Sequence, residues 1–388
     1  MARVFLLSAL LVGTTSAWAQ DPNAVTQREI DQAIRKGAEY LKTAPSTGGW
    51  LHANCDELIL LTMIHAGIPE TNPKFEEYLR HCLQAPLEKT YKVALLAMAL
   101  EELDASGYQM KIAQCAAFLL DNQAANGQWL YGKPVDLKNY PFVEREKKTA
   151  SDGGKPAGAR EFGPTVRERK KPSKAIVVPQ TRHEGESGDN SNSQYAALGL
   201  RACFDANIKL PADALHLARK WWVESQWPDD TEAKVGKGAV NSGGDTTRVQ
   251  GWSYKKPGDE GQKAPYHAMT AGAIGATVII EYMLGRDFKK DAVTRAGVNW
   301  IAKNYAVNSN LYYMYALERA GMIYGTEMMG THKWYPEGAK VLIETQGANG
   351  AWGSTVDTCF AILFLKRATR ALGVETLSAA QMRARNGK

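Results

Sequence analysis

One short phrase recurs along this sequence and limits what the chain can fold into. In each copy a helix-like run, which often ends in Gln, is followed by a Gly-containing link and then by Gly-x-Trp or Gly-Trp. The copies reach their indole at Trp50, Trp129, Trp252 and Trp352. Such self-similarity is typical of repeat architectures, in which each unit buries its apolar face against the next. We interpret the phrase as structural, because a Gln amide can bond the terminal groups of the next helix and pack on the indole.

The helical segments between these phrases alternate between two kinds. The first kind carries charges on one face and apolar residues on the other, in segments 25–42, 73–83, 110–123, 212–226, 287–304 and 334–346. The second kind is apolar nearly all round, in segments 57–66, 91–100, 193–204, 268–284, 311–320 and 358–365. A helix that is apolar on every side must be covered on every side. The sequence therefore predicts an all-α fold with little sheet, an α/α toroid of about six inner and six outer helices.

The N-terminus is typical of a removable secretory signal. A basic residue at Arg3 precedes the apolar run 4–12, and small residues at Ala17 and Ala19 follow it. We expect a signal peptide over residues 1–19, cleavage near Ala19 and a periplasmic or secreted protein. We expect no transmembrane helix, because the best later candidate, 271–284, is shorter than the roughly twenty residues that span a bilayer and contains Glu281.

The rest of the chain, 20–388, is predicted to be a single domain with two interruptions. The stretch 133–188 is rich in Lys, Arg, Gly, Pro and Glu and predicts a solvated, partly disordered insertion at one rim of the toroid. The stretch 228–265 predicts a second long loop. Glycines at Gly67, Gly285 and Gly321 fall where inner helices are expected to stop.

Composition and motifs exclude several classes of function. The 47 basic residues are nearly balanced by 41 acidic ones, so we expect no nucleic-acid partner. There is no P-loop, Rossmann glycine fingerprint, HExxH or GxSxG, so no cofactor is predicted.

The cysteines do not form a disulfide pattern that can be read from their spacing. There are five, at Cys55, Cys82, Cys115, Cys203 and Cys359, and none belongs to a CxxC motif. Their apolar, helix-like surroundings favour small buried side chains, and a bridge from Cys115 to Cys55 or Cys82 is the alternative.

The Gln…Gly-x-Trp phrases and the alternating helices resemble the repeat shared by squalene and terpenoid cyclases and by protein prenyltransferase β-subunits. The resemblance extends over nearly all of the mature chain outside the two interruptions. The strings 188–196, 312–319 and 357–361 look like the exported, prenyltransferase/squalene oxidase repeat-containing branch of that superfamily. The resemblance implies a terpenoid cyclase-like toroid, but it implies no single activity, because one fold hosts many chemistries.

The catalytic motifs of the superfamily are only partly present. Cyclases use the central carboxyl of Asp-x-Asp-Asp as a proton donor. Here Asp229 and Asp230 match the last two residues of that motif, but the first Asp is missing. At the start of a later inner helix, Asp357 is preceded by Val356, which takes the place of the proton donor. We interpret Asp229 and Asp230 as a turn.

Prenyltransferases bind zinc through Asp-x-Cys and a later His. Asp357 and Cys359 provide the first two ligands, but no His follows them, so His332 or His267 would have to complete the set. Our main expectation is therefore that there is no metal, with Asp357, Cys359 and His332 as the alternative.

The remaining candidates lie where the inner helices begin, and there we expect a pocket for a hydrophobic or glycan ligand or for a protein partner. The predicted ligand-binding residues are Asn190, Asn192, Gln194, Tyr195, Trp252, Tyr254, Thr270, Tyr312 and Tyr315. The enzyme alternatives are isoprenoid chemistry, which needs an aromatic inner surface with one buried acid, and polysaccharide lysis or hydrolysis, for which Asp189 with Asp357, or His267 with Tyr313, would be the catalytic pair. A deep apolar chamber would favour isoprenoids, an open polar cleft glycans, and a filled interior a structural role.

Overall fold

The computed structural model describes residues 25–46, 54–143, 171–229 and 248–372. These residues form twelve α-helices, one 3-10 helix and four strands of two residues each, so the prediction of an all-α fold is confirmed. The expected signal peptide, the first Gly-Trp phrase, Asp230 and the central parts of both interruptions lie outside these ranges. Within them, no helix combines the length and the apolar character that a membrane span requires.

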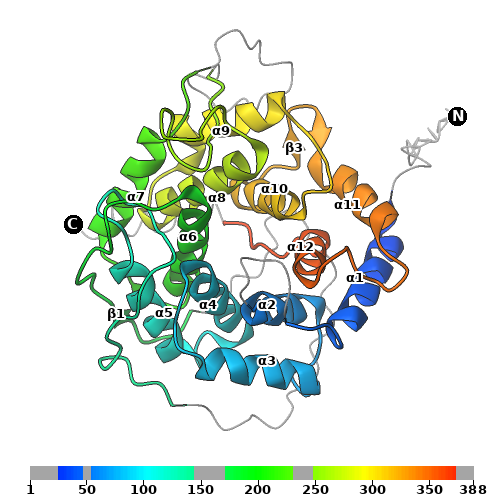
Figure 1. Ribbon diagram of the computed structural model, residues 1–388, viewed down its shortest axis with the longest axis horizontal. Helices are drawn as coiled ribbons and strands as arrows, with labels where there is room; N and C mark the ends of the chain where they lie inside the picture. Colours follow the sequence, from blue (N-terminus) through cyan, green and yellow to red (C-terminus); the bar gives the residue numbers. More distant parts are fainter. Residues whose placement is uncertain (1–24, 47–53, 144–170, 230–247, 373–388) are drawn as a thin grey trace, which may run out of the picture.

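Two sets of helices alternate along the chain, as predicted. The inner set is α2 (Asp56–Ala66), α4 (Thr90–Asp104), α6 (Asn190–Asp205), α8 (His267–Met283), α10 (Leu311–Tyr324) and α12 (Thr355–Leu365). The outer set is α1 (Gln27–Leu41), α3 (Pro73–Gln84), α5 (Gln109–Asp121), α7 (Ala212–Glu224), α9 (Ala292–Lys303) and α11 (Trp334–Thr345). Figure 1 shows the inner set around the middle of the molecule and the outer set around it.

The remaining elements are short. The 3-10 helix η1 (Phe288–Lys290) precedes α9. Strand β1 (Ile176–Val177) pairs in parallel with β2 (Ile208–Lys209), and β3 (Met328–Met329) pairs antiparallel with β4 (His332–Lys333).

The inner helices contact one another in a closed cycle. Each of α2, α4, α6, α8 and α10 contacts the next, and α12 contacts both α10 and α2. Burial follows this arrangement: in α8 every residue from Ala268 to Glu281 is buried. Burial of these side chains on all faces is what the apolar sequence of the inner helices requires.

In three of the repeat phrases a Gln joins two outer helices. The amide of Gln123, which follows α5, donates to a carbonyl of α7 over 2.9 Å. Gln226, after α7, donates to α9, and Gln346, after α11, donates to Ala33 of α1, both also over 2.9 Å. The last of these bonds joins the two ends of the described chain.

The Trp of each phrase joins an outer helix to the inner helix that follows it. In the three described copies the indole N–H donates to a carbonyl of the preceding outer helix, and the Trp main-chain N–H donates to a hydroxyl of the following inner helix. The sets are Trp129 with Leu119 and Ser193, Trp252 with Trp222 and Thr270, and Trp352 with Leu342 and Thr358. The structural interpretation of the repeat phrase is confirmed for these three copies.

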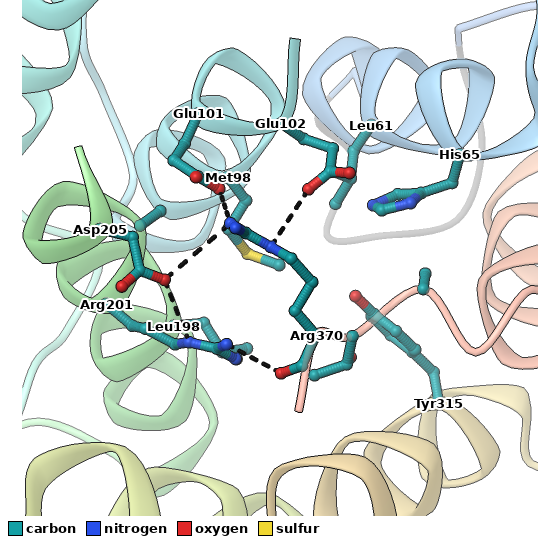
Figure 2. Close-up of a pocket in the computed structure, with 13 residues that line it drawn as sticks. Leu61, His65, Met98, Glu101, Glu102, Leu198, Arg201, Asp205, Tyr315 and Arg370 are labelled. Atoms are coloured by element: carbon teal, nitrogen blue, oxygen red, sulfur yellow. Dashed lines mark hydrogen bonds and ion pairs between the residues drawn. The ribbon is translucent and has the colours of Figure 1, made fainter. Parts of the chain in front are cut away.

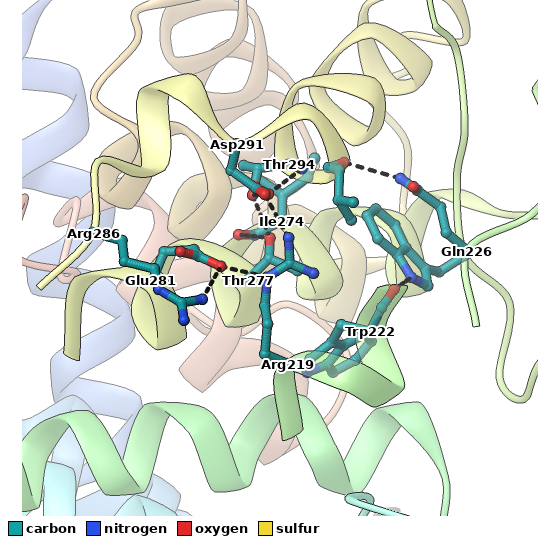
Figure 3. Close-up of polar contacts among 11 residues, drawn as sticks. Arg219, Trp222, Gln226, Ile274, Thr277, Glu281, Arg286, Asp291 and Thr294 are labelled. Atoms are coloured by element: carbon teal, nitrogen blue, oxygen red, sulfur yellow. Dashed lines mark hydrogen bonds and ion pairs between the residues drawn. The ribbon is translucent and has the colours of Figure 1, made fainter. Parts of the chain in front are cut away.

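A buried ion-pair network reinforces one of these junctions. Arg219 of α7 bonds both Glu281 of α8 and Asp291, as Figure 3 shows. Asp291 also caps α9 by accepting the main-chain N–H of Thr294 over 2.7 Å. One guanidinium therefore fixes α7 relative to the two helices that follow it.

The described ends of the 133–188 insertion are hydrogen-bonded to α5. Their side chains are mostly exposed, but Gln180 donates to the Leu120 carbonyl over 2.7 Å and Thr181 donates to Asp121. Gln109 of α5 donates in turn to the carbonyl of Lys174. Because these segments cover it, α5 is buried on nearly all faces, although its sequence predicts a polar outer face.

Two further expectations can be compared with the structure. All five cysteines are buried and free, as expected for small core side chains, so the alternative bridges are not formed. The predicted end of an inner helix at Gly321 is wrong, because α10 continues to Tyr324 and ends at Gly325, which has a φ of 71°. Gly321 serves another purpose: a Cβ there would lie 2.4 Å from Cε2 of Trp334.

We predict that Gly321→Ala lowers the free energy of unfolding by about 1–3 kcal/mol, because the added methyl overpacks against the Trp334 ring. The matched control is Gly275→Ala in α8, where a Cβ would meet nothing closer than 3.8 Å. The control should keep or raise stability by up to about 1 kcal/mol through helix propensity. Urea denaturation measures both variants, and equal effects would contradict the assigned contact.

Candidate ligand-binding site

The start of α6 meets the start of α10. The hydroxyl of Ser191 lies 2.8 Å from the hydroxyl of Tyr312, and Gln194 Nε2 donates to the same hydroxyl over 2.7 Å. Gln194 Oε1 accepts from Arg319 of α10 over 2.9 Å. The side chain of Gln194 fits here because Gly272 of α8 has no Cβ to collide with it.

The interior next to this contact is filled by aromatic rings around a guanidinium. Arg319 is 2% exposed and lies over the rings of Tyr195 and Tyr315, at 5.4 and 4.2 Å from their centroids. Tyr315 stacks in turn on Phe360 of α12 at 5.7 Å. Burial raises the pKa of both tyrosines, so they remain neutral hydroxyls. Three predicted ligand-binding residues therefore contact the same buried side chain, Arg319. They are Gln194, Tyr195 and Tyr315.

Three more predicted ligand-binding residues make contacts between helices. Trp252 is fully buried, and its main-chain N–H donates to the Thr270 hydroxyl over 3.0 Å. Asn190 is also buried, and its Oδ1 accepts from the indole N–H of Trp221 over 2.7 Å. These contacts hold helices together and leave the three side chains away from solvent.

Of the two proposed catalytic pairs, the structure brings one together. The rings of His267 and Tyr313 meet edge to face at 5.2 Å. However, His267 Nε2 lies 2.6 Å from the carbonyl of Asn304, and the Tyr313 hydroxyl donates to that of Ala306. Both polar groups are thus engaged by main-chain oxygens.

The other pair and the alternative zinc ligands are spread over different elements. Asp189 caps α6 and Asp357 bonds Ser354 at the start of α12, which lies opposite α6 in the cycle of inner helices. Cys359 is buried in α12, whereas His332 stacks on Tyr305 at 4.1 Å. Among the described residues, no group of three or more His, Cys, Asp or Glu side chains is arranged to hold a metal ion.

Asp189, which is 2% exposed, belongs to the part of the predicted site that lies beside exposed rings. Its carboxylate accepts from the main-chain and side-chain N–H groups of Asn192, over 2.7 and 2.9 Å, and hydrogen-bonds the Tyr254 hydroxyl. Burial raises the pKa of Asp189 despite these bonds. The Oδ1 atom of Asn192 is buried beside this group without a hydrogen-bond partner. This oxygen is an unused acceptor.

Two exposed rings complete this part of the site. Tyr131 and Tyr266 are 37% and 40% exposed, and both lie near enough to Asp189 for its charge to raise the pKa of their hydroxyls, after burial as the larger cause. For Tyr266 the result is a pKa of about 12. We call Tyr131, Tyr254 and Tyr266, together with Asp189, the tyrosine rim.

Tyr131 and Tyr266 were not among the residues predicted from the sequence. Tyr131 stands two residues after Trp129, as Tyr254 stands two residues after Trp252. This equivalent position in the repeat could have predicted Tyr131 as a site residue. Tyr266 directly precedes α8 and had no comparable signal.

The opposite end of the inner helices is occupied by the segment 366–372 that follows α12, as Figure 2 shows. Arg370 forms ion pairs with Glu101 and Glu102 at the end of α4 and with Asp205 at the end of α6. Its carbonyl accepts from Arg201 over 2.8 Å. The cavity that remains beside Arg370 has a volume of about 50 Å³, which is room for water rather than for a ligand.

Comparisons with known proteins add no identification. No model of a protein family matches this chain, and no curated protein matches its sequence. The features of the structure that bear on function are the tyrosine rim, the filled interior and the closed opposite end.

We predict that Arg370→Ala destabilises the fold by about 3 kcal/mol, because it leaves buried carboxylates without their cation. The matched control is Arg286→Ala, since Arg286 is exposed and lies 3.7 Å from Glu281. Removing this exposed ion pair should cost less than about 1 kcal/mol. Thermal and urea unfolding of both variants give the comparison; an Arg370 variant as stable as the control would show that the segment does not close this end.

Proposed function

We propose that the protein is an exported α/α toroid of the prenyltransferase and squalene cyclase repeat superfamily. The closed cycle of inner-helix contacts supports the toroid. The Gln and Trp bonds, which recur at three junctions and join Gln346 to Ala33, support the repeat. The signal-like residues 1–19 support export.

We further propose that the protein binds a glycan at the tyrosine rim. The observation that carries this proposal is the exposure of Tyr131 and Tyr266 beside the carboxylate of Asp189. A sugar has apolar C–H faces that stack on aromatic rings, and it has hydroxyl groups that donate to a carboxylate or amide oxygen. Asp189 and the unused Oδ1 of Asn192 are such acceptors, but both side chains are buried, so a sugar hydroxyl reaches them only where neighbouring side chains move aside.

The same contacts favour a glycan over an isoprenoid. An isoprenoid needs a deep apolar chamber, but the interior beside α6 and α10 holds Arg319 and the polar groups bonded to it. At the other end Arg370 and its partners fill the opening. A ligand is therefore expected on the surface at the start of the inner helices, where aromatic rings are exposed.

The catalytic alternatives receive less support. In the pair that lies together, His267 and Tyr313, each polar group meets a main-chain carbonyl. A general base needs to reach the proton that it removes. Binding without turnover is accordingly our proposed function.

We predict that Tyr131→Ala and Tyr266→Ala each weaken glycan binding by roughly tenfold, as the loss of one stacking ring of about 1.4 kcal/mol implies. The matched control is Val223→Ala, because Val223 is a 45% exposed apolar residue on α7 outside the tyrosine rim. The full chain is first applied to a glycan array, and the variants are compared on the best ligand by calorimetry. A chain that binds no glycan, or variants that bind as tightly as the control, would contradict the proposal.

A further inference from the structure

A polar cleft lies where α2 and α4 begin, apart from the tyrosine rim. Its volume is about 380 Å³, which is within the range of small-molecule sites. The polar residues that line it are Asn54, Asp56, Glu57, His81, Gln84 and Lys92. None of these residues was predicted from the sequence to have a role, and none belongs to the tyrosine rim.

Glu57 is the unusual residue of this cleft. It is 6% exposed, and its Oε2 atom has no hydrogen-bond partner. Its other oxygen lies 3.6 Å from the ammonium of Lys92. A buried carboxylate oxygen without a donor costs free energy unless a ligand supplies the donor.

The neighbouring groups do not supply that donor. Lys92 is shared, because it also donates to Asn54 over 2.7 Å and lies 3.7 Å from Glu88. Asp56 accepts from the Ser46 hydroxyl and lies 3.6 Å from Nδ1 of His81. Glu57 and Glu88 therefore share Lys92, whereas Asp56 pairs with His81, whose side chain is exposed.

Four further titratable groups near Glu57 are neutral, because burial raises the pKa of each: Cys55, which precedes α2, Cys82 of α3, Tyr91 of α4 and Cys115 of α5. Lys111 of α5 acts on Cys82 and Cys115, does not line the cleft, and has its pKa lowered by burial. At the cleft itself, Asp56, Glu57 and Glu88 outnumber Lys92.

We propose that this cleft binds a small organic cation through a primary ammonium group that donates to Glu57 Oε2 and to Asp56. An ammonium has three donors and a positive charge, which match the unused oxygen and the excess of carboxylates. A divalent metal fits less well, because no group of three or more His, Cys, Asp or Glu side chains among the described residues is arranged to hold a metal ion. This proposal does not rest on glycan binding at the tyrosine rim.

The titration of Glu57 gives the proposal a pH signature. Burial, only partly offset by Lys92, raises the pKa of Glu57 to about 7. The ammonium binds the ionised carboxylate, which is the main form above this pKa and is lost as the pH falls below it. Affinity is therefore expected to be about tenfold higher at pH 8 than at pH 6.

The test is calorimetric titration of the full chain with 5-amino-1-pentanol at pH 6 and pH 8. The neutral comparison is 1,5-pentanediol, in which a hydroxyl replaces the ammonium. We expect the amine to bind about tenfold more tightly at pH 8, and the diol not to bind. No binding of the amine, or equal binding of the diol, would overturn the proposal.

Three variants assign the effect to Glu57. Glu57→Gln should weaken amine binding at pH 8 at least tenfold and abolish its pH dependence, whereas Glu88→Gln, at an exposed residue next to the same lysine, should change little. His81→Gln should keep the pH dependence, and a flat profile in that variant would transfer the effect to His81 and refute the role of Glu57. If Glu57→Gln does not fold, the native chain decides: binding at pH 7 should release about half a proton, and release of none would contradict the proposal.

Discussion

The structure depends on covering helices that are apolar on every side. A helix such as α8, with an unbroken buried run from Ala268 to Glu281, cannot face water on any side. Its neighbours in the inner set have the same need, and the cycle of contacts from α2 to α12 and back meets it without leaving an uncovered end. The outer helices then cover the remaining faces. Closing the cycle requires contacts between the first and last parts of the chain, which explains why Gln346 bonds Ala33.

The two ends of the inner helices differ because different segments reach them. At the starts of these helices, loops that follow Trp129 and Trp252 bring Tyr131 and Tyr254 to the carboxylate of Asp189. At their ends, the segment after α12 places Arg370 among carboxylates of α4 and α6 (Figure 2). Ligand binding is therefore proposed at the starts, where the rings of Tyr131 and Tyr266 are exposed. The Glu57 cleft lies at the same ends of α2 and α4, but it offers charge instead of aromatic rings.

Periodicity predicted all twelve helices because the inner and outer patterns reflect how many faces of each helix are buried. The spacing of Gln and Trp predicted the junctions, since their bonds join segments that follow one another in the repeat. The helix end expected at Gly321 was wrong, because a glycine within a helix can serve a close contact, here with Trp334, as well as a stop.

The candidate site was only partly predictable. Asp189 and Tyr254 were expected near a ligand, but the inward positions of Tyr195 and Tyr315 were not distinguishable from ligand-facing ones. Glu57 and Arg370 were missed because their roles arise from contacts between helices distant in the sequence. In the sequence Glu57 appears only as an acidic residue in the first turn of a helix, a position common for helix stability alone.

The closure between the ends of the chain is the claim on which the account depends most. Lys36 of α1 and Ala348, after α11, are both exposed, and the neighbouring Gly350 contacts the main chain at Lys36. Spin labels placed by K36C and A348C, with the five native cysteines buried and unlabelled, report this contact by electron paramagnetic resonance. The account predicts strong dipolar broadening in the folded protein that disappears in urea. A folded-state spectrum of the doubly labelled protein that equals the sum of the spectra of the two singly labelled proteins would contradict closure.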